Sequence, residues 1–145
     1  MTTNPELNFL RWADIRAEWG WIKPRVDAIR DKCSKDWRTE DVYAACVYNK
    51  AQLFVGCGEW EHRGFFILQV ELNPYTLQNS LFIWLAQGET QGLYPVFYSE
   101  LRSIARFMNC SSIRFKSPRQ GWNRAALIRP VMTEFELPME DDTHV

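Results

Sequence analysis

The chain has 145 residues, and 46% of them are hydrophobic, with seven Trp, nine Phe and five Tyr in the sequence. This length and composition indicate one globular domain with its own apolar core, and they exclude an intrinsically disordered chain. Lys and Arg together number 17, and Asp and Glu together number 18, which gives a net charge of -1. Without an excess of basic residues, nucleic acid is excluded as the main partner.

The four cysteines are scattered along the chain, and no two of them form a C-x-x-C pair. Because the chain has only two His as further ligands, this pattern predicts no metal site and no disulfide framework. Residues 1–6 lack the basic start and apolar stretch of a secretion signal, and no apolar run is long enough to span a membrane. We therefore expect a cytoplasmic protein with free thiols and no membrane partner.

A loose leader at residues 1–9 is expected to precede a long stretch in which apolar residues recur at helical spacing, from Trp12 to Cys33. Gly20 and Pro24 interrupt this stretch. A proline ring inside a helix clashes with the carbonyl group four residues earlier. We therefore expect either one kinked helix or two short helices.

A second helix is predicted to start at Thr39, whose side chain can cap it, and to end near Asn49. Residues 51–57 and 65–72 are rich in bulky apolar side chains, and the turn between them is bounded by glycines. Two such runs joined by a short turn are typical of an antiparallel hairpin.

The central part of the chain predicts a strand, a loop, a helix and a second strand. Residues 81–86 are a short apolar run, and residues 87–92 form a polar connector with two glycines. In the helix that follows, apolar residues recur every three or four positions, whereas Glu100 and Arg106 lie between them and are expected to face water. Residues 112–116 read as the next strand, which a helical connection makes parallel to the first.

The chain ends in a predicted strand at residues 131–137 and an acidic tail at residues 138–145. A single domain is therefore expected over residues 10–137. The order of its elements predicts an α+β fold with a mixed sheet. Two N-terminal helices and an antiparallel hairpin come first, and the strand–loop–helix–strand unit lies in the middle.

The loop before the central helix is a candidate binding site for an anion. The first amides of a helix have no carbonyl partners and carry the positive end of the helix dipole, so the backbone around Gly92 can hold an anion such as a phosphate. The alternative is that Gly88 and Gly92 serve only the geometry of the turn.

Three stretches resemble the GNAT (Gcn5-related N-acetyltransferase) family, in particular small GNAT-like proteins of tailed phages. Residues 37–42 together with 51–55 resemble the second helix and first strand of that group, and residues 81–86 resemble the central strand. Residues 112–122, which end in Arg-Gln-Gly-Trp, are similar to the strand and turn that follow. The resemblance covers nearly the whole chain.

The resemblance implies a site for acetyl-CoA or another acyl-CoA, and an amine that accepts the acyl group. In GNAT enzymes the loop between the central strand and the helix binds the pyrophosphate of CoA. The matching residues here are Leu85, Ala86, Gln87, Gly88, Gln91 and Gly92. Their order, Gln-Gly-Glu-Thr-Gln-Gly over residues 87–92, differs from the family signature Gln/Arg-x-x-Gly-x-Gly/Ala.

Acyl transfer to an amine also needs a base for the ammonium proton and an acid for the leaving thiolate. Glu71 is a candidate for the base and Cys110 for the acid; the alternatives are a solvated charge at a strand end and a buried packing residue. Arg119 and Trp122 are candidates for substrate binding, because an arginine beside a tryptophan can grip a carboxylate or phosphate. Alternatively, Trp122 anchors the turn and Arg119 stacks on it.

Two functions therefore stay open. The first is an N-acyltransferase that moves an acyl group from acyl-CoA directly to an amine. The second is a non-catalytic protein of the same fold that acts through protein partners, for example as a phage virion or assembly component. A sequence with seven Trp suits an apolar contact surface of that kind.

Overall fold

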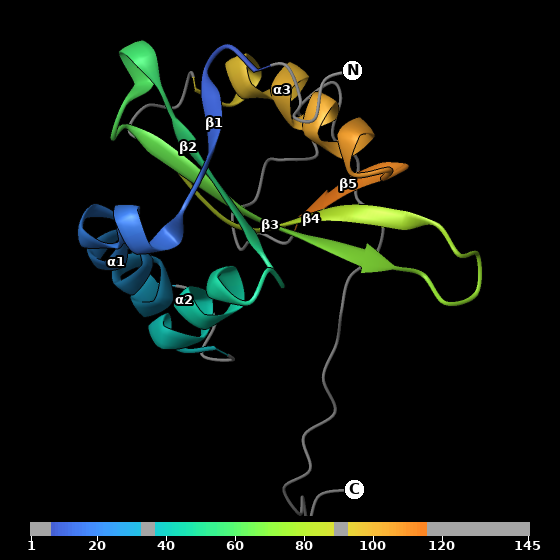
Figure 1. Ribbon diagram of the computed structural model, residues 1–145, viewed down its shortest axis with the longest axis horizontal. Helices are drawn as coiled ribbons and strands as arrows, with labels where there is room; N and C mark the ends of the chain where they lie inside the picture. The colour runs from blue at the N-terminus through green and yellow to red at the C-terminus, as the bar shows by residue number, and fades with distance from the viewer. Residues whose placement is uncertain (1–6, 33–36, 89–92, 116–145) are drawn as a thin grey trace, which may run out of the picture.

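The computed structural model describes residues 7–32, 37–88 and 93–115 (Figure 1). In chain order the elements are β1 (Leu10–Ala13), α1 (Ile15–Lys32), α2 (Thr39–Val47), β2 (Gln52–Gly56), the short 3-10 helix η1 (Gly58–Trp60), β3 (Gly64–Leu72), β4 (Asn79–Gly88), α3 (Leu93–Phe107) and β5 (Ser112–Phe115). The strands form one sheet in the order β1-β2-β3-β4-β5.

Neighbouring strands are antiparallel from β1 to β4, whereas β4 and β5 are parallel. The predicted α+β fold with a mixed sheet is therefore confirmed, together with the β2–β3 hairpin and the parallel β4–α3–β5 unit. The strand expected at residues 131–137 and the tail at residues 138–145 lie outside the described residues, so these domain limits stay predictions.

The helices cover the two faces of the sheet separately, with α1 and α2 on one face and α3 on the other (Figure 1). Alternation along the strands supplies both cores. Phe66 and Leu68 of β3 face α3, whereas Phe65 and Ile67 face α1 and α2, and all four side chains are buried. Since both faces of β3 are covered, its sequence shows a continuous apolar run.

The N-terminal region differs from the expectation. Helical spacing assigns Trp12 to a helix, but the residue belongs to β1, where its ring stacks on Phe54 at 5.7 Å between centroids. α1 is a single helix with Pro24 inside it, so the alternative of two short helices is wrong. Ile22 and Val26, on either side of Pro24, are fully buried. Their packing outweighs the cost of about 3 kcal/mol that an interior proline brings.

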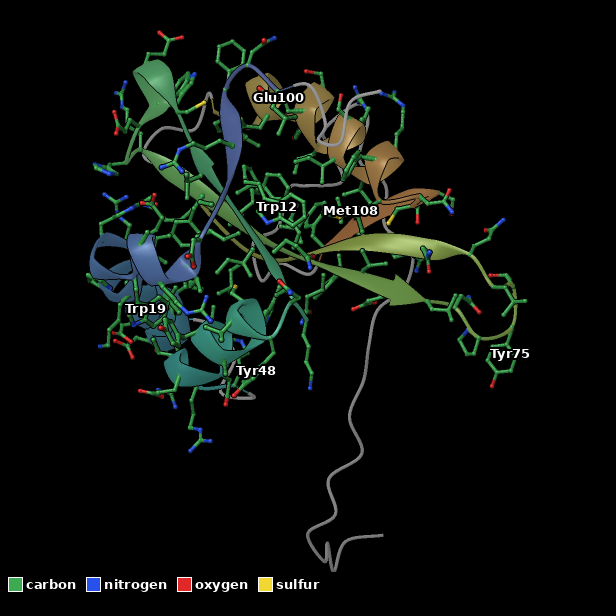
Figure 2. The ribbon with its side chains drawn as sticks, in the orientation of Figure 1. Trp12, Trp19, Tyr48, Tyr75, Glu100 and Met108 are labelled. Carbon is green, nitrogen blue, oxygen red and sulfur yellow. The ribbon has the colours of Figure 1, made fainter. Side chains whose placement is uncertain are left out.

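A buried glutamate on α3 holds the N-terminal segment against the sheet (Figure 2). Glu100 is only 5% exposed, so the expectation that it faces water is wrong. Its carboxylate accepts hydrogen bonds from three successive backbone N–H groups, those of Asn8, Phe9 and Leu10, at 2.9–3.1 Å. Phe9 also packs against the α3 core. Residues 7–9, which are the described part of the leader expected at residues 1–9, therefore contact the folded domain.

Replacement of Glu100 by glutamine is expected to destabilise the protein by about 2 kcal/mol, because hydrogen bonds to a charged acceptor contribute about 1.5–3 kcal/mol. The amide group would also turn a donor toward backbone N–H groups. Urea unfolding measures the effect, with Glu40→Gln on the exposed face of α2 as the control. A loss no larger than that of the control would contradict the role of Glu100.

A second buried carboxylate joins β1 to α1. Glu18 accepts hydrogen bonds from the Arg11 guanidinium at 2.6 Å and from the Trp21 indole N–H at 2.5 Å. Burial acts to raise the pKa of Glu18, but these hydrogen bonds and the charge of Arg11 outweigh it and hold the pKa below its usual value of 4.5. The ionised carboxylate is therefore the form that stabilises the fold.

This lowered pKa predicts a pH-dependent loss of stability. The contribution of Glu18 is present above the unfolded-state pKa of 4.5 and is lost as the pH falls through the lower folded-state pKa. Glu18→Gln is expected to unfold more easily than the wild type at pH 7 and to approach the stability of the wild type as the pH falls through the lowered folded-state pKa. Urea unfolding across pH tests this, with exposed Glu61→Gln as the control. A gap that does not change with pH would contradict it.

Candidate functional site

The centre of the sheet is interrupted by a β-bulge in β4. Ile67 pairs with Leu85 and Leu68 pairs with Ile83, so Trp84 has no opposite residue on β3. As a result, Trp84 and Leu85 are consecutive and yet both belong to the core under α1 and α2. A bulge of this kind bends the strand and increases its local twist.

The described pairing of β4 with β5 ends at the same point, because Phe115 is the last residue of β5 that the structure describes. The parallel pairing runs from Ser80–Ser112 to Ile83–Phe115, whereas β4 continues to Gly88. Among the residues that the structure describes, 84–88 therefore have no partner on the β5 side. At about 3.3 Å per residue this open edge is about 16 Å long. In the described part of the chain, the N–H and C=O groups of this edge have no strand partner on the β5 side, and such groups suit a ligand with an extended, amide-bearing chain.

The open edge ends close to a helix N-terminus. β4 ends at Gly88 and α3 begins at Leu93, so few residues separate the edge from the helix. The first turn of a helix such as α3 presents backbone N–H groups without partners inside the helix, and the positive end of the helix dipole, to an anion. An elongated ligand with an anionic end fits this combination.

The residues expected to bind the cofactor fall partly on this edge. Leu85, Ala86, Gln87 and Gly88 are its last four residues; Leu85 is buried in the core under α1 and α2, and Ala86 faces α3. Gln91 and Gly92 lie outside the described residues, as do Arg119 and Trp122.

Glu71 and Cys110 lie at the other end of the sheet. Glu71 is exposed and pairs with Ser80, eight residues before Gly88 on β4, which is about 25 Å along the strand. Cys110 precedes β5, where its thiol lies 3.7 Å from the Met108 carbonyl and burial raises its pKa. The structure thus brings neither side chain to the open edge, because strand direction places them at the opposite end.

An aromatic pair that the sequence analysis missed covers the bulge. Trp84 and Trp37 meet edge to face at 6.0 Å, and both rings are half-buried. The Arg30 side chain donates a hydrogen bond to the Trp37 carbonyl at 3.0 Å and so fixes the start of α2 beside the sheet. Spacing gives no signal for this pair, since 46 residues of sequence lie between Trp37, which precedes α2, and Trp84 of β4.

Two other classes of site find no support in the described part of the chain. Residues 7–32, 37–88 and 93–115 contain no group of three His, Cys, Asp or Glu side chains that could hold a metal ion. No helix in the same ranges combines the length and apolar character that crossing a membrane requires.

Comparison with known proteins finds matches by structure and none by sequence. No family model and no curated protein sequence matches the chain. A possible acetyltransferase from Clostridium difficile 630 is similar with a TM-score of 0.63 and 15% identity, over 92% of this chain and 99% of that one. Ribosomal-protein-alanine N-acetyltransferase from Brucella melitensis biovar Abortus 2308 has a TM-score of 0.64 and 11% identity, over 92% and 98%.

A third structure is a predicted acetyltransferase with acetyl-CoA from Clostridium acetobutylicum. Its TM-score is 0.66 and its identity 13%, over 93% of this chain and 98% of that one. The chain has a GNAT-like fold. Because the sequence identity is so low, the similarity to these structures shows only that the helices and strands have the same arrangement. What the chain binds has to be argued from its own site.

Proposed function

We propose that the protein is an N-acyltransferase that transfers an acyl group from acyl-CoA directly to an amine. The observation that carries this proposal is the edge of β4 at residues 84–88, which has no partner on the β5 side among the described residues and leads from the last described β4–β5 pair to the start of α3. The GNAT-like fold, with one neighbour solved with acetyl-CoA, supports the same reading.

In this proposal the pantetheine arm of the donor lies along the open edge and makes strand-like hydrogen bonds with it. The pyrophosphate lies at the N-terminus of α3, with Gln87, Gly88, Gln91 and Gly92 around it. The thioester then stops at Ile83, where β5 closes the gap beside β4.

The chemistry is a single acyl transfer. The amine nitrogen attacks the thioester carbonyl, a C–N bond forms and the C–S bond breaks, and the ammonium proton leaves as the CoA thiolate takes up a proton. On this account Arg119 and Trp122 bind the acceptor. Glu71 and Cys110 stay the candidates for the base and the acid: Glu71 pairs with Ser80, three residues before Ile83 on β4, and Cys110 comes two residues before Ser112, which pairs with the same Ser80.

Isothermal titration tests the proposal through binding rather than through an unknown acceptor. CoA is expected to bind with a Kd on the order of 100 μM or tighter, within the usual range for enzyme substrates. Adenosine 3′,5′-bisphosphate, which has phosphates but lacks the arm, is expected to bind at least about tenfold more weakly. Absence of CoA binding at about 1 mM would overturn the proposal.

A second candidate function is a non-catalytic interaction protein, for example a component of a phage particle or of its assembly. The observation that favours it is the β3–β4 hairpin, which projects beyond the body of the molecule with Tyr75 at its tip (Figures 1 and 2). Tyr75 is 93% exposed, and Leu72, Leu77 and Val70 are also exposed. Exposed apolar residues grouped in this way mark contact surfaces.

The hairpin tip is well ordered, because the Asn73 side chain accepts hydrogen bonds from the backbone N–H groups of Tyr75 and Thr76. If this tip is a contact surface, light scattering coupled to size exclusion is expected to show a complex larger than one chain. The double substitution Tyr75→Ser and Leu77→Ser should dissociate it, whereas exposed Tyr48→Ser on the far side should not. A monomer before and after substitution would contradict self-association through the tip.

A further inference from the structure

A groove of about 380 Å³ runs between α3 and β5. Its apolar walls come from Ile83 on β4, Leu101 on α3, and Ile113 and Phe115 on β5. Tyr98 lines one end of the groove and Cys110 the other. The proposed path of the donor along β4 assigns no role to this groove.

The groove begins where the open edge ends. Ile83 and Phe115 form the last β4–β5 pair that the structure describes, and both side chains line the groove. A donor arm that follows the open edge toward Ile83 therefore arrives at the mouth of the groove. The acyl group cannot continue between the paired strands, so it has to turn to one face of the sheet.

Only one face has room for it among the described residues. On the side of α1 and α2, Leu85 is 5% exposed and Trp84 is packed against Trp37. On the side of α3, the groove is hollow next to Ile83. The acyl group is therefore directed into the groove beside α3.

The groove also carries positive charge. Arg102 and Arg106 are four residues apart on α3, and both line it. Both are exposed, and no carboxylate in the described part of the chain forms an ion pair with either. The acidic residue of α3, Glu100, is turned away and binds the N-terminal segment. A ligand that enters the groove thus contacts the apolar side chains first and the guanidinium groups of Arg102 and Arg106 next.

The distances suit a short chain. From Tyr98 to Arg102 is four residues, about 6 Å along the helix axis, and from Tyr98 to Arg106 is about 12 Å. An acyl chain that enters the groove on the side of Tyr98 therefore reaches Arg102 one helical turn before Arg106. Arginine binds carboxylates with paired, charge-assisted hydrogen bonds.

We propose that the α3–β5 groove binds the acyl part of the donor, and that the preferred donor is an acyl-CoA whose acyl chain ends in a carboxylate paired with Arg102 or Arg106. This inference rests on the proposed acyltransferase function and specifies its donor class. The terminal carboxylate stays unreacted, and the thioester at the other end of the chain is the group that is transferred.

Titration calorimetry with matched donors tests the inference. Glutaryl-CoA and valeryl-CoA have the same chain length and differ in the terminal carboxylate. The wild type is expected to bind glutaryl-CoA about tenfold more tightly, an advantage that one charge-assisted contact can supply. The double substitution Arg102→Ala and Arg106→Ala should abolish this advantage and leave the affinity for valeryl-CoA unchanged.

Arg114→Ala is the control. Arg114 is exposed on β5 between Ile113 and Phe115, whose side chains line the groove. Because successive side chains of a strand point to opposite faces, Arg114 points to the other face of the sheet. The preference should survive this substitution. Equal affinity for the two donors in the wild type, or a preference that persists without Arg102 and Arg106, overturns the inference and leaves the acyltransferase proposal standing. Failure of every CoA ester to bind overturns both.

The chain itself offers one competing occupant, since residues 131–145 contain five acidic residues and no Lys or Arg. A full-length variant with Glu140, Asp141 and Asp142 changed to their amides separates the two possibilities. The preference for glutaryl-CoA is expected to be the same in this variant as in the wild type. A preference that appears only in the variant would assign the arginines to the tail and overturn the inference.

Discussion

The edge of β4 after Ile83, which no described residue of β5 covers, is the feature on which the rest of the proposed site depends. The bulge at Trp84 bends and twists β4 at the same point, so the paired and the open part of the strand meet within one residue. Pairing of β4 as far as Gly88 would satisfy the backbone groups of residues 84–88 within the sheet. No open edge would then remain for a ligand, and the α3–β5 groove would lie beside a β4 strand that is paired along its whole length.

A second constraint fixes the helix that stands over this opening. Glu100 ties α3 to the N-terminal segment through three backbone hydrogen bonds, and Leu10 at the end of that segment begins β1. β1 is the edge strand farthest from β5, so one side chain links α3 across the width of the sheet. The same link keeps the polar face of α3, with Arg102 and Arg106, directed to the groove.

The architecture could be predicted from the sequence, because its strands and helices have clear periods. The antiparallel hairpin, the amphipathic α3 and the parallel connection all follow from apolar spacing and turn residues. β1 could not be found in this way, since its four residues run directly into the helical spacing of α1. Glu100 was misplaced because spacing shows which residues lie between apolar positions but not what lies opposite them.

The site was less predictable than the fold. Residues 81–86 are all apolar, so the sequence carries no alternation from which a bulge at Trp84 could be recognised. Glu71, a candidate for the base, pairs with Ser80, and the register of β3 against β4 that decides this position cannot be read from the segment around Glu71. Tertiary pairing of this kind is not encoded in local spacing.

Amide hydrogen exchange with and without CoA tests the central claim most directly, because it reports on the backbone of β4 residue by residue. If β4 is open beyond Ile83 and receives the donor there, edge-facing amides within residues 84–88 exchange faster than those of residues 81–83. CoA should then slow the exchange of residues 84–88. Uniform protection along β4 without ligand, or no change on addition of CoA, would contradict the account.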